Sequence, residues 1–135
     1  MRMISIDLGG TTFRARLLDG NAPTTCEALW NALSLRGRGV HAQWSGEMFR
    51  MYEHVDLGIL EPEVRGAFQH PGEVIYCPSA REIAICYGMA RFRGALGPVY
   101  CTPVAEIEDD LDMLRARAER LQWDGAKTLE IARLA

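Results

Sequence analysis

The chain has 135 residues, of which 48% are hydrophobic, and its formal net charge is −3 at pH 7. This length suits one domain, expected to span residues 1–135, and excludes two ordinary domains. So mild a charge argues against nucleic acid or a membrane surface as a partner, and no apolar run approaches the roughly 20 residues needed to span a bilayer. The first residues also lack the pattern of a secretory signal, so we expect a cytoplasmic protein.

Two alternating segments open the chain. In residues 3–8 and 11–17 apolar side chains take every second position, which predicts two β-strands with one buried face each. Gly9 and Gly10 lie between them and can adopt the positive φ angles of a tight turn. These segments are therefore predicted to form a β-hairpin.

A helix is predicted over about residues 24–33. Pro23 suits the first helical turn, and Thr24 with Glu27 fits a capping box, in which two side chains bind the free backbone N–H groups of the helix start. The helix follows the hairpin directly, so we expect it to cover one end of the fold.

A second hairpin is predicted over residues 36–51. Val40, Ala42 and Trp44 alternate with polar residues, and the small residues Ser45 and Gly46 can turn the chain. From residue 52 to residue 71 the periodicity fails, and glycine, proline, histidine and acidic residues accumulate. A loop of this length in a small domain is commonly functional.

The rest of the chain predicts more sheet and a second helix. Its acidic first turns and basic last turns match the helix dipole. The expected strands cover residues 72–77, 82–87, 99–105 and 128–134, and the helix covers about 107–122. The whole order predicts a mainly β fold, a closed barrel with two helices, in which the two ends of the chain contribute adjacent strands.

One motif near the N-terminus suggests a different fold. The sequence Asp7-Leu8-Gly9-Gly10-Thr11-Thr12 looks like the first phosphate loop of the hexokinase and actin superfamily. Those enzymes need two large α/β domains, and no second phosphate loop or adenosine motif appears later in this chain. We therefore reject ATP binding by a sugar-kinase-like protein.

The same hairpin, followed by the helix sequence APTTCEALWNAL, resembles the opening of the cyclophilins. Later segments strengthen the resemblance, namely HAQWSGE at 41–47, PGEV at 71–74, EIAICYG at 82–88 and GPVYCTPVAEI at 97–107. Together they resemble a bacterial family of cyclophilin-like proteins of unknown function over nearly the whole chain. The resemblance implies a cyclophilin-like closed barrel and no established reaction.

The chain departs from the true prolyl isomerases in the residues that matter for their activity. Those enzymes carry a Phe-His-Arg strand soon after the first helix, whose arginine polarises the prolyl amide, and no Phe-His-Arg occurs here. The Met-Ala-Gln-type segment that lines their proline pocket is also missing. A peptidyl-prolyl isomerase or peptide-binding chaperone is therefore the alternative to our preferred interpretation.

His41, Trp44, Ser45 and Glu47 form the densest group of candidate functional residues. The predicted turn brings Glu47 near His41, and a carboxylate beside an imidazole favours the charged ring and fixes its tautomer, as a general base requires. His41 is expected to point away from the core, opposite Val40. The other explanation is a surface hairpin with a structural tryptophan.

A second group follows on the strand at 82–87. One concave surface is predicted to be lined by His41, Trp44, Glu47 and Glu82, with Arg91 or Arg93 at its edge to hold a carboxylate or phosphate. Tyr87 is a further candidate ligand contact. A solvated strand end is the other explanation for Glu82, and Cys86 on its face is expected to be buried and inert.

No metal and no cofactor are expected. The cysteines have no C-x-x-C spacing and predict buried reduced thiols, and the spacing of histidines and acids in the long loop matches no standard ligand pattern. The loop residues considered are His54, Asp56, Glu61, Glu63 and His70.

The preferred interpretation is a small barrel that binds a small molecule in a surface or barrel-mouth pocket. The arginines favour an anionic ligand, and whether the protein transforms it stays open. Proposed catalytic residues are His41, Glu47 and Glu82, and proposed ligand contacts are Trp44, Ser45, Tyr87, Arg91 and Arg93. A non-catalytic subunit of a homo-oligomer is the third alternative.

Overall fold

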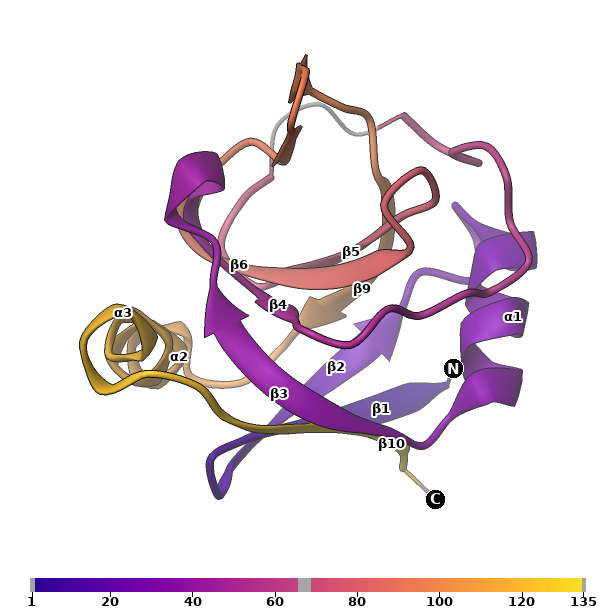
Figure 1. Cartoon of the computed structure of the whole chain (residues 1–135). Coiled ribbons are helices and arrows are strands. Elements are labelled where there is room, and N and C mark those ends of the chain that lie inside the picture. The colour runs from indigo at the N-terminus through magenta and orange to yellow at the C-terminus, as the bar shows by residue number, and fades with distance from the viewer. Residues whose placement is uncertain (1, 66–68, 135) are drawn as a thin grey trace.

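The computed structural model describes residues 2–65 and 69–134. In these ranges eight strands form a closed barrel in which each neighbouring pair is antiparallel (Figure 1). In barrel order the strands are β1 (Met3–Leu8), β10 (Lys127–Arg133), β3 (Leu35–His41), β4 (Gly46–Met51), β6 (Glu82–Ala90), β5 (Glu73–Cys77), β9 (Thr102–Ile107) and β2 (Thr11–Leu17). The mainly β barrel with two helical regions confirms the predicted fold class.

The first hairpin and the meeting of the chain ends also agree with the sequence prediction. Gly9 and Gly10 have φ angles of 58° and 98°, which turn the chain between β1 and β2. On the other side β1 pairs with β10, where Ile6 lies opposite Ile131 and both side chains are fully buried. The two terminal strands are therefore adjacent and close the barrel.

The first helix, α1 (Pro23–Ala32), lies where it was predicted but is capped differently. Its N-cap is Ala22, and no side chain of its own first turn binds the free N–H groups. Instead the carboxylate of Glu63 accepts hydrogen bonds from the backbone of Thr24 and Thr25 and from the Thr25 hydroxyl, at 2.7–3.1 Å. The capping-box prediction was wrong because a residue of the long loop occupies that role.

The second predicted helix begins later than expected and is interrupted. Glu106 and Ile107 belong to β9, and α2 (Leu111–Glu119) begins after Asp110, whose carboxylate caps its first turn. A short α3 (Leu121–Asp124) follows. Figure 1 shows α1 and the α2–α3 pair on opposite sides of the barrel. None of the helices in the described ranges is long and apolar enough to cross a membrane.

The barrel has a second, smaller core on its outside. The interior core contains residues such as Phe49, Tyr76 and Ile85 together with apolar side chains from both helical regions. The outer core lies under the segment 92–101, which includes a small hairpin of β7 (Arg93–Gly94) and β8 (Gly97–Pro98). Strands β4, β5 and β6 are consequently buried on both faces along much of their length.

All four cysteines are free and buried, as predicted. Cys77, Cys86 and Cys101 belong to the outer core, and Cys26 belongs to the interior core. Burial raises the pKa of the Cys86 thiol, which keeps it in the protonated, unreactive form.

Candidate functional site

The candidate residues separate onto two faces of one sheet. His41 lies opposite Phe49, and Phe49 lies opposite Ile85, so His41 shares the interior face with these two core residues. Glu82 precedes Ile83 on β6 and points to the outer face, because successive strand residues alternate. The predicted shared groove of His41 and Glu82 was therefore wrong.

The reason lies in the outer core. The prediction assigned Val40 and Ala42 to the core face of their strand, and Ala42 is indeed 98% buried. The core that buries Ala42, however, is the outer one, together with Met48 and Phe92. A strand buried on its outer face shows the same alternation of apolar and polar residues as a strand buried on its inner face. The prediction therefore assigned the apolar residues of this strand to the barrel interior, whereas Ala42 is buried in the outer core.

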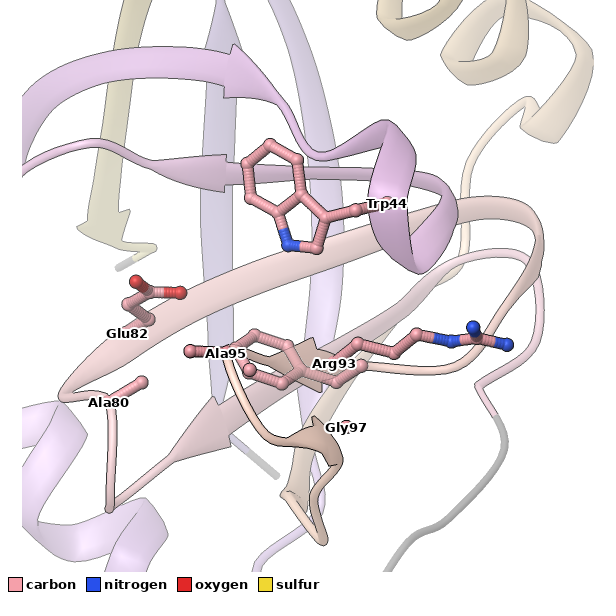
Figure 2. A pocket seen from close by; sticks show the side chains of 8 residues that line it. Trp44, Ala80, Glu82, Arg93, Ala95 and Gly97 are labelled. Carbon is pink, nitrogen blue, oxygen red and sulfur yellow. The ribbon is translucent and has the colours of Figure 1, made fainter.

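A cavity of about 640 Å³ lies on the outer face (Figure 2). Trp44 forms one side, Arg93 and Ala95 lie opposite it, and Glu82 lies near one end, while Phe92 also lines the cavity. Trp44, Glu82 and Arg93 therefore line one cavity, and their role in binding stays a prediction.

Trp44 owes its position to a single turn of 3-10 helix, η1 (Gln43–Ser45). The backbone N–H of Ser45 donates to the Ala42 carbonyl at 2.8 Å, and Gly46, with a φ of 109°, returns the chain into β4. The turn leaves the indole 55% exposed beside the cavity. A large aromatic face is thus held by a tight turn where a ligand can reach it.

Glu82 is neutralised by Arg50, an arginine outside the cavity lining. Its Oε1 lies 3.4 Å from Nη1 of Arg50, and both side chains are more than four-fifths buried. This carboxylate is therefore both paired with an arginine and part of the cavity lining. The sequence did not identify Arg50 as this partner. The strand register brings the two together, because Arg50 lies opposite Ala84, which shares a face of the sheet with Glu82.

Arg91 and Arg93 reach the site through backbone bonds to Ser45. The N–H of Arg91 donates to the Ser45 carbonyl at 2.8 Å, and the N–H of Arg93 donates to its hydroxyl oxygen at 3.0 Å. Ser45 is 96% buried, and these two hydrogen bonds connect its turn to the segment that carries Arg91 and Arg93. It also lines, with Arg91 and Arg93, a second hollow of about 420 Å³ that shares Trp44 with the first.

The interior face carries a separate polar cluster between β3, β6 and α2. Nε2 of His41 lies 2.5 Å from the Tyr87 hydroxyl, with the ring planes tilted at 60°. Tyr87 is 97% buried, and burial raises its pKa to about 12. It contacts His41 inside the barrel and lines neither hollow beside Trp44, so it lies apart from the other proposed ligand contacts.

Glu47 approaches the same cluster but is engaged by other groups. Its carboxylate forms an ion pair with Arg115 of α2 and accepts a hydrogen bond from the Met89 N–H at 2.9 Å. These bonds hold the pKa of Glu47 below its usual value. Burial lowers the pKa of His41, against the smaller opposing effects of Glu119 and Glu47. The expected charged imidazole was therefore wrong, because desolvation outweighs the carboxylates.

The depressed pKa of His41 makes stability pH-dependent. Since the unfolded imidazole titrates near about 6.5, the unfolded chain binds more protons than the folded chain just below that pH. The stabilising contribution of neutral His41 should be complete above about pH 6.5 and should be lost as the pH falls through the folded pKa. The groups facing the ring are Tyr87 from β6, Glu47 from β4 and Glu119 from α2, and Arg115 of α2 contacts the Tyr87 ring.

We therefore expect urea unfolding to show a steeper loss of stability for wild type than for His41→Gln between pH 7 and about pH 5. The comparison cancels the other two histidines, which titrate in both proteins. Parallel pH profiles for the two proteins would contradict the assignment.

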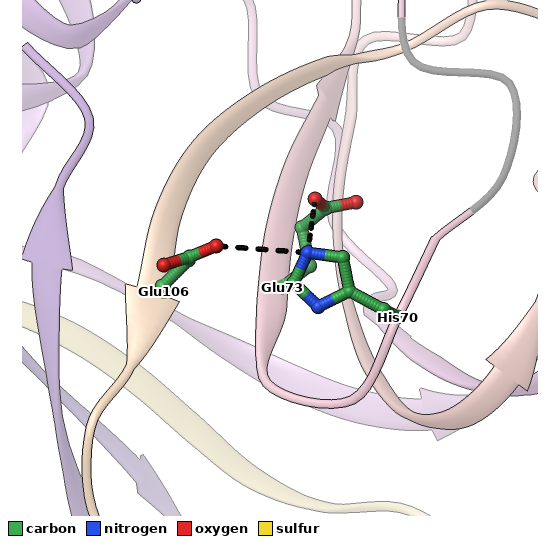
Figure 3. A group of neighbouring side chains, drawn as sticks. All are labelled: His70, Glu73 and Glu106. Carbon is green, nitrogen blue, oxygen red and sulfur yellow. Dashed lines mark ion pairs between the residues drawn. The ribbon is translucent and has the colours of Figure 1, made fainter. Parts of the chain in front are cut away.

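A third cluster joins the end of the long loop to the barrel. In the described ranges His70, Glu73 and Glu106 form the one group of three metal-ligating side chains whose ligand atoms all lie within 4.8 Å of one another (Figure 3). Of the loop residues considered from the sequence, only His70 is a member. His54 instead contacts the Ala80 carbonyl at 3.1 Å, and Glu63 caps α1.

Comparison with known proteins adds a family and a fold. A family model described as "Protein of unknown function (DUF3830)" matches residues 4–133. No curated protein matches the chain. A structure described as "Structure of McbB in complex with tryptophan" is similar with a TM-score of 0.75 at 19% identity, over 96% of this chain and 44% of that one. The chain thus spans less than half the length of the McbB chain.

A second similar structure has nearly the same length. The hypothetical protein AF2241 from Archaeoglobus fulgidus matches with a TM-score of 0.65 at 12% identity, over 98% of this chain and 95% of that one. At these identities both structures share the fold alone.

Proposed function

The chain belongs to the DUF3830 family of proteins of unknown function, and we propose that it binds a small anionic molecule in the cavity between Trp44 and the β7–β8 hairpin. The observation that carries the proposal is one cavity combining an exposed indole, an apolar wall and an arginine that is not needed to neutralise the buried carboxylate. The cavity volume of about 640 Å³ is typical of small-molecule sites.

The charges in the cavity favour an anion. Arg50 offsets the negative charge of Glu82, so the guanidinium of Arg93 contributes the remaining charge among the residues that line the cavity. In Figure 2 this guanidinium lies at the opposite end from Glu82. Guanidinium groups bind carboxylates and phosphates through paired, charge-assisted hydrogen bonds.

The apolar surfaces favour a ligand with a flat body. The Trp44 indole and the Phe92 ring both line the cavity, and aromatic side chains stack on planar groups. The ligand class is therefore a planar or apolar molecule with an acid group. Tryptophan, which McbB is described as binding, belongs to that class and should be in the first screen.

A thermal-shift screen of carboxylates and phosphates, followed by calorimetry on the hits, tests this proposal. We expect Trp44→Ala and Arg93→Gln each to weaken binding of a hit by about tenfold or more, equivalent to about 1.4 kcal/mol. Trp123→Ala and Arg36→Gln are matched controls, since both side chains are exposed and lie outside the cavity. A screen without hits, or hits that bind both cavity variants as tightly as wild type, would overturn the proposal.

We also propose that the barrel is of the cyclophilin-like type without prolyl isomerase activity. The closed antiparallel barrel with a helix packed onto its core supports the type, and the missing Phe-His-Arg strand argues against the activity. A standard prolyl-peptide assay should therefore give the uncatalysed rate. Catalysis at the level of ordinary cyclophilins would favour the alternative, a peptidyl-prolyl isomerase.

A further inference from the structure

Two carboxylates face each other on the outside of the barrel. Glu73 of β5 and Glu106 of β9 are directly opposite in the strand register. Like charges at opposed positions destabilise a sheet, and a buried carboxylate is unfavourable unless it is paired. Glu73 is 94% buried, which makes the arrangement costly without a positive charge.

The protein groups around these carboxylates supply only part of that charge. Arg16 binds Glu106 at 3.0 Å, but it is shared with Glu108 at 3.3 Å. Oε2 of Glu73 faces His70, whereas its Oε1 is buried without a hydrogen-bond partner among the described residues. Oε1 is the oxygen that does not face His70, so His70 leaves part of the buried Glu73 carboxylate without a partner among the described residues.

The orientation of His70 also supports an additional positive charge at this site. Its Nδ1 lies 3.3 Å from the carbonyl oxygen of Pro71, and a carbonyl only accepts hydrogen bonds, so Nδ1 carries a proton. Nε2 then faces Glu73 Oε2 at 3.0 Å and Glu106 Oε1 at 3.6 Å (Figure 3). Histidines that bind metals characteristically donate their other ring N–H to a carbonyl or carboxylate in this way.

We propose that His70, Glu73 and Glu106 bind a divalent transition-metal ion of the Zn²⁺ class. Ligand atoms about 2.1 Å from a tetrahedral ion lie about 3.4 Å from one another, and the observed separations of 3.0 and 3.6 Å bracket that distance. One imidazole and two carboxylates are a common donor set for such ions. Arg16 orients the Glu106 carboxylate from behind.

Three protein ligands leave a coordination position open, as in catalytic rather than structural zinc sites. Glu73 and Glu106 also line a cavity of about 480 Å³ with Arg16, Asp19 and Pro103. This cavity gives an ion a path from solvent and gives a water or small ligand room beside it. The site shares no lining residue with the Trp44 cavity and does not depend on the function proposed there.

The test is calorimetric titration of the metal-free full chain with ZnCl₂, with melting curves in parallel. We expect one Zn²⁺ per chain and a raised melting temperature for wild type, and a loss of affinity of about a hundredfold or more for His70→Ala and Glu73→Gln. His54→Ala is the matched control, because it removes an imidazole outside the cluster and should bind as wild type does. With Co²⁺, visible d–d absorption without thiolate charge-transfer bands should identify nitrogen and oxygen ligands rather than the buried cysteines.

The His70 variant keeps the test decisive if Glu73→Gln folds poorly, because the His70 side chain is 56% exposed. If zinc leaves the melting temperature of wild type unchanged, the three residues are an ion-paired cluster only and the proposal fails. It also fails if His70→Ala binds zinc as tightly as wild type does.

Discussion

Gly46→Ala should destabilise the barrel by about 2–5 kcal/mol, since it adds backbone strain to a steric clash. Gly46 has a φ of 109°, a conformation that residues with a Cβ rarely adopt. A Cβ built there would lie 2.6 Å from the backbone carbonyl oxygen of Met89 and 3.2 Å from the Cα of Ala90. Neither atom can move without breaking the β4–β6 pairing, so the strain cannot be relieved locally.

The same substitution should also reduce ligand binding, because Gly46 follows the turn that positions Trp44 and Ser45. Gly20→Ala is the matched control. Gly20 has no positive φ, and a Cβ there would meet no atom within 4 Å. Chemical denaturation should show the midpoint of Gly46→Ala well below wild type and that of Gly20→Ala within about 0.5 kcal/mol of it. Equal midpoints for the two variants would contradict this account of the turn.

The parts of the fold that could be predicted are those in which neighbours along the chain determine the outcome. Alternation in residues 3–8 and 11–17 with Gly9 and Gly10 between them predicts a hairpin, and β1 and β2 form it. The helix boundary at Leu111 failed because Ile107 fits a helical stripe as well as a strand. Its backbone N–H donates to the Gly72 carbonyl at 2.8 Å, a contact between distant segments.

The candidate site was predictable only in part, because its faces depend on a second core. No local signal shows that the segment 92–101 folds back over β4, β5 and β6, and this cover reverses the side on which Ala42 is buried. Trp44, Glu82 and Arg93 nevertheless line one cavity, although Glu82 is mostly buried against Arg50.

The cluster of His70, Glu73 and Glu106 could not be found from spacing. Its carboxylates meet through the register of β5 with β9, strands that are separated by β6 and the outer hairpin along the chain. The one sequence signal was the pair His70 and Glu73, three residues apart, but His70 was assigned to the long loop and Glu73 to the strand at 72–77. A pattern search limited to nearby residues misses donors that strand pairing brings together.

The long loop provides the second large expected effect, at Tyr76. This residue of β5 is fully buried, and its hydroxyl donates to the Val55 carbonyl at 2.8 Å and accepts from the Leu57 N–H at 3.1 Å. Tyr76→Phe keeps the ring and its packing but leaves a buried carbonyl and an N–H without partners, which should cost about 1–3 kcal/mol. The loss should appear as a lower denaturation midpoint and as faster hydrogen exchange at the Leu57 amide.

A second tyrosine separates this effect from general changes in the aromatic core. Tyr52, at the start of the same loop, is half exposed. The Arg38 guanidinium carbon lies 4.5 Å from the centre of its ring, and phenylalanine would keep this cation–π contact. Tyr52→Phe should therefore stay within about 0.5 kcal/mol of wild type. If Tyr76→Phe does the same, and the Leu57 amide exchanges at the wild-type rate, the hydroxyl does not hold the loop. The loop would then be attached to the rest of the fold mainly by Glu63, which caps α1, and by the Val55 N–H, which donates to the Arg81 carbonyl.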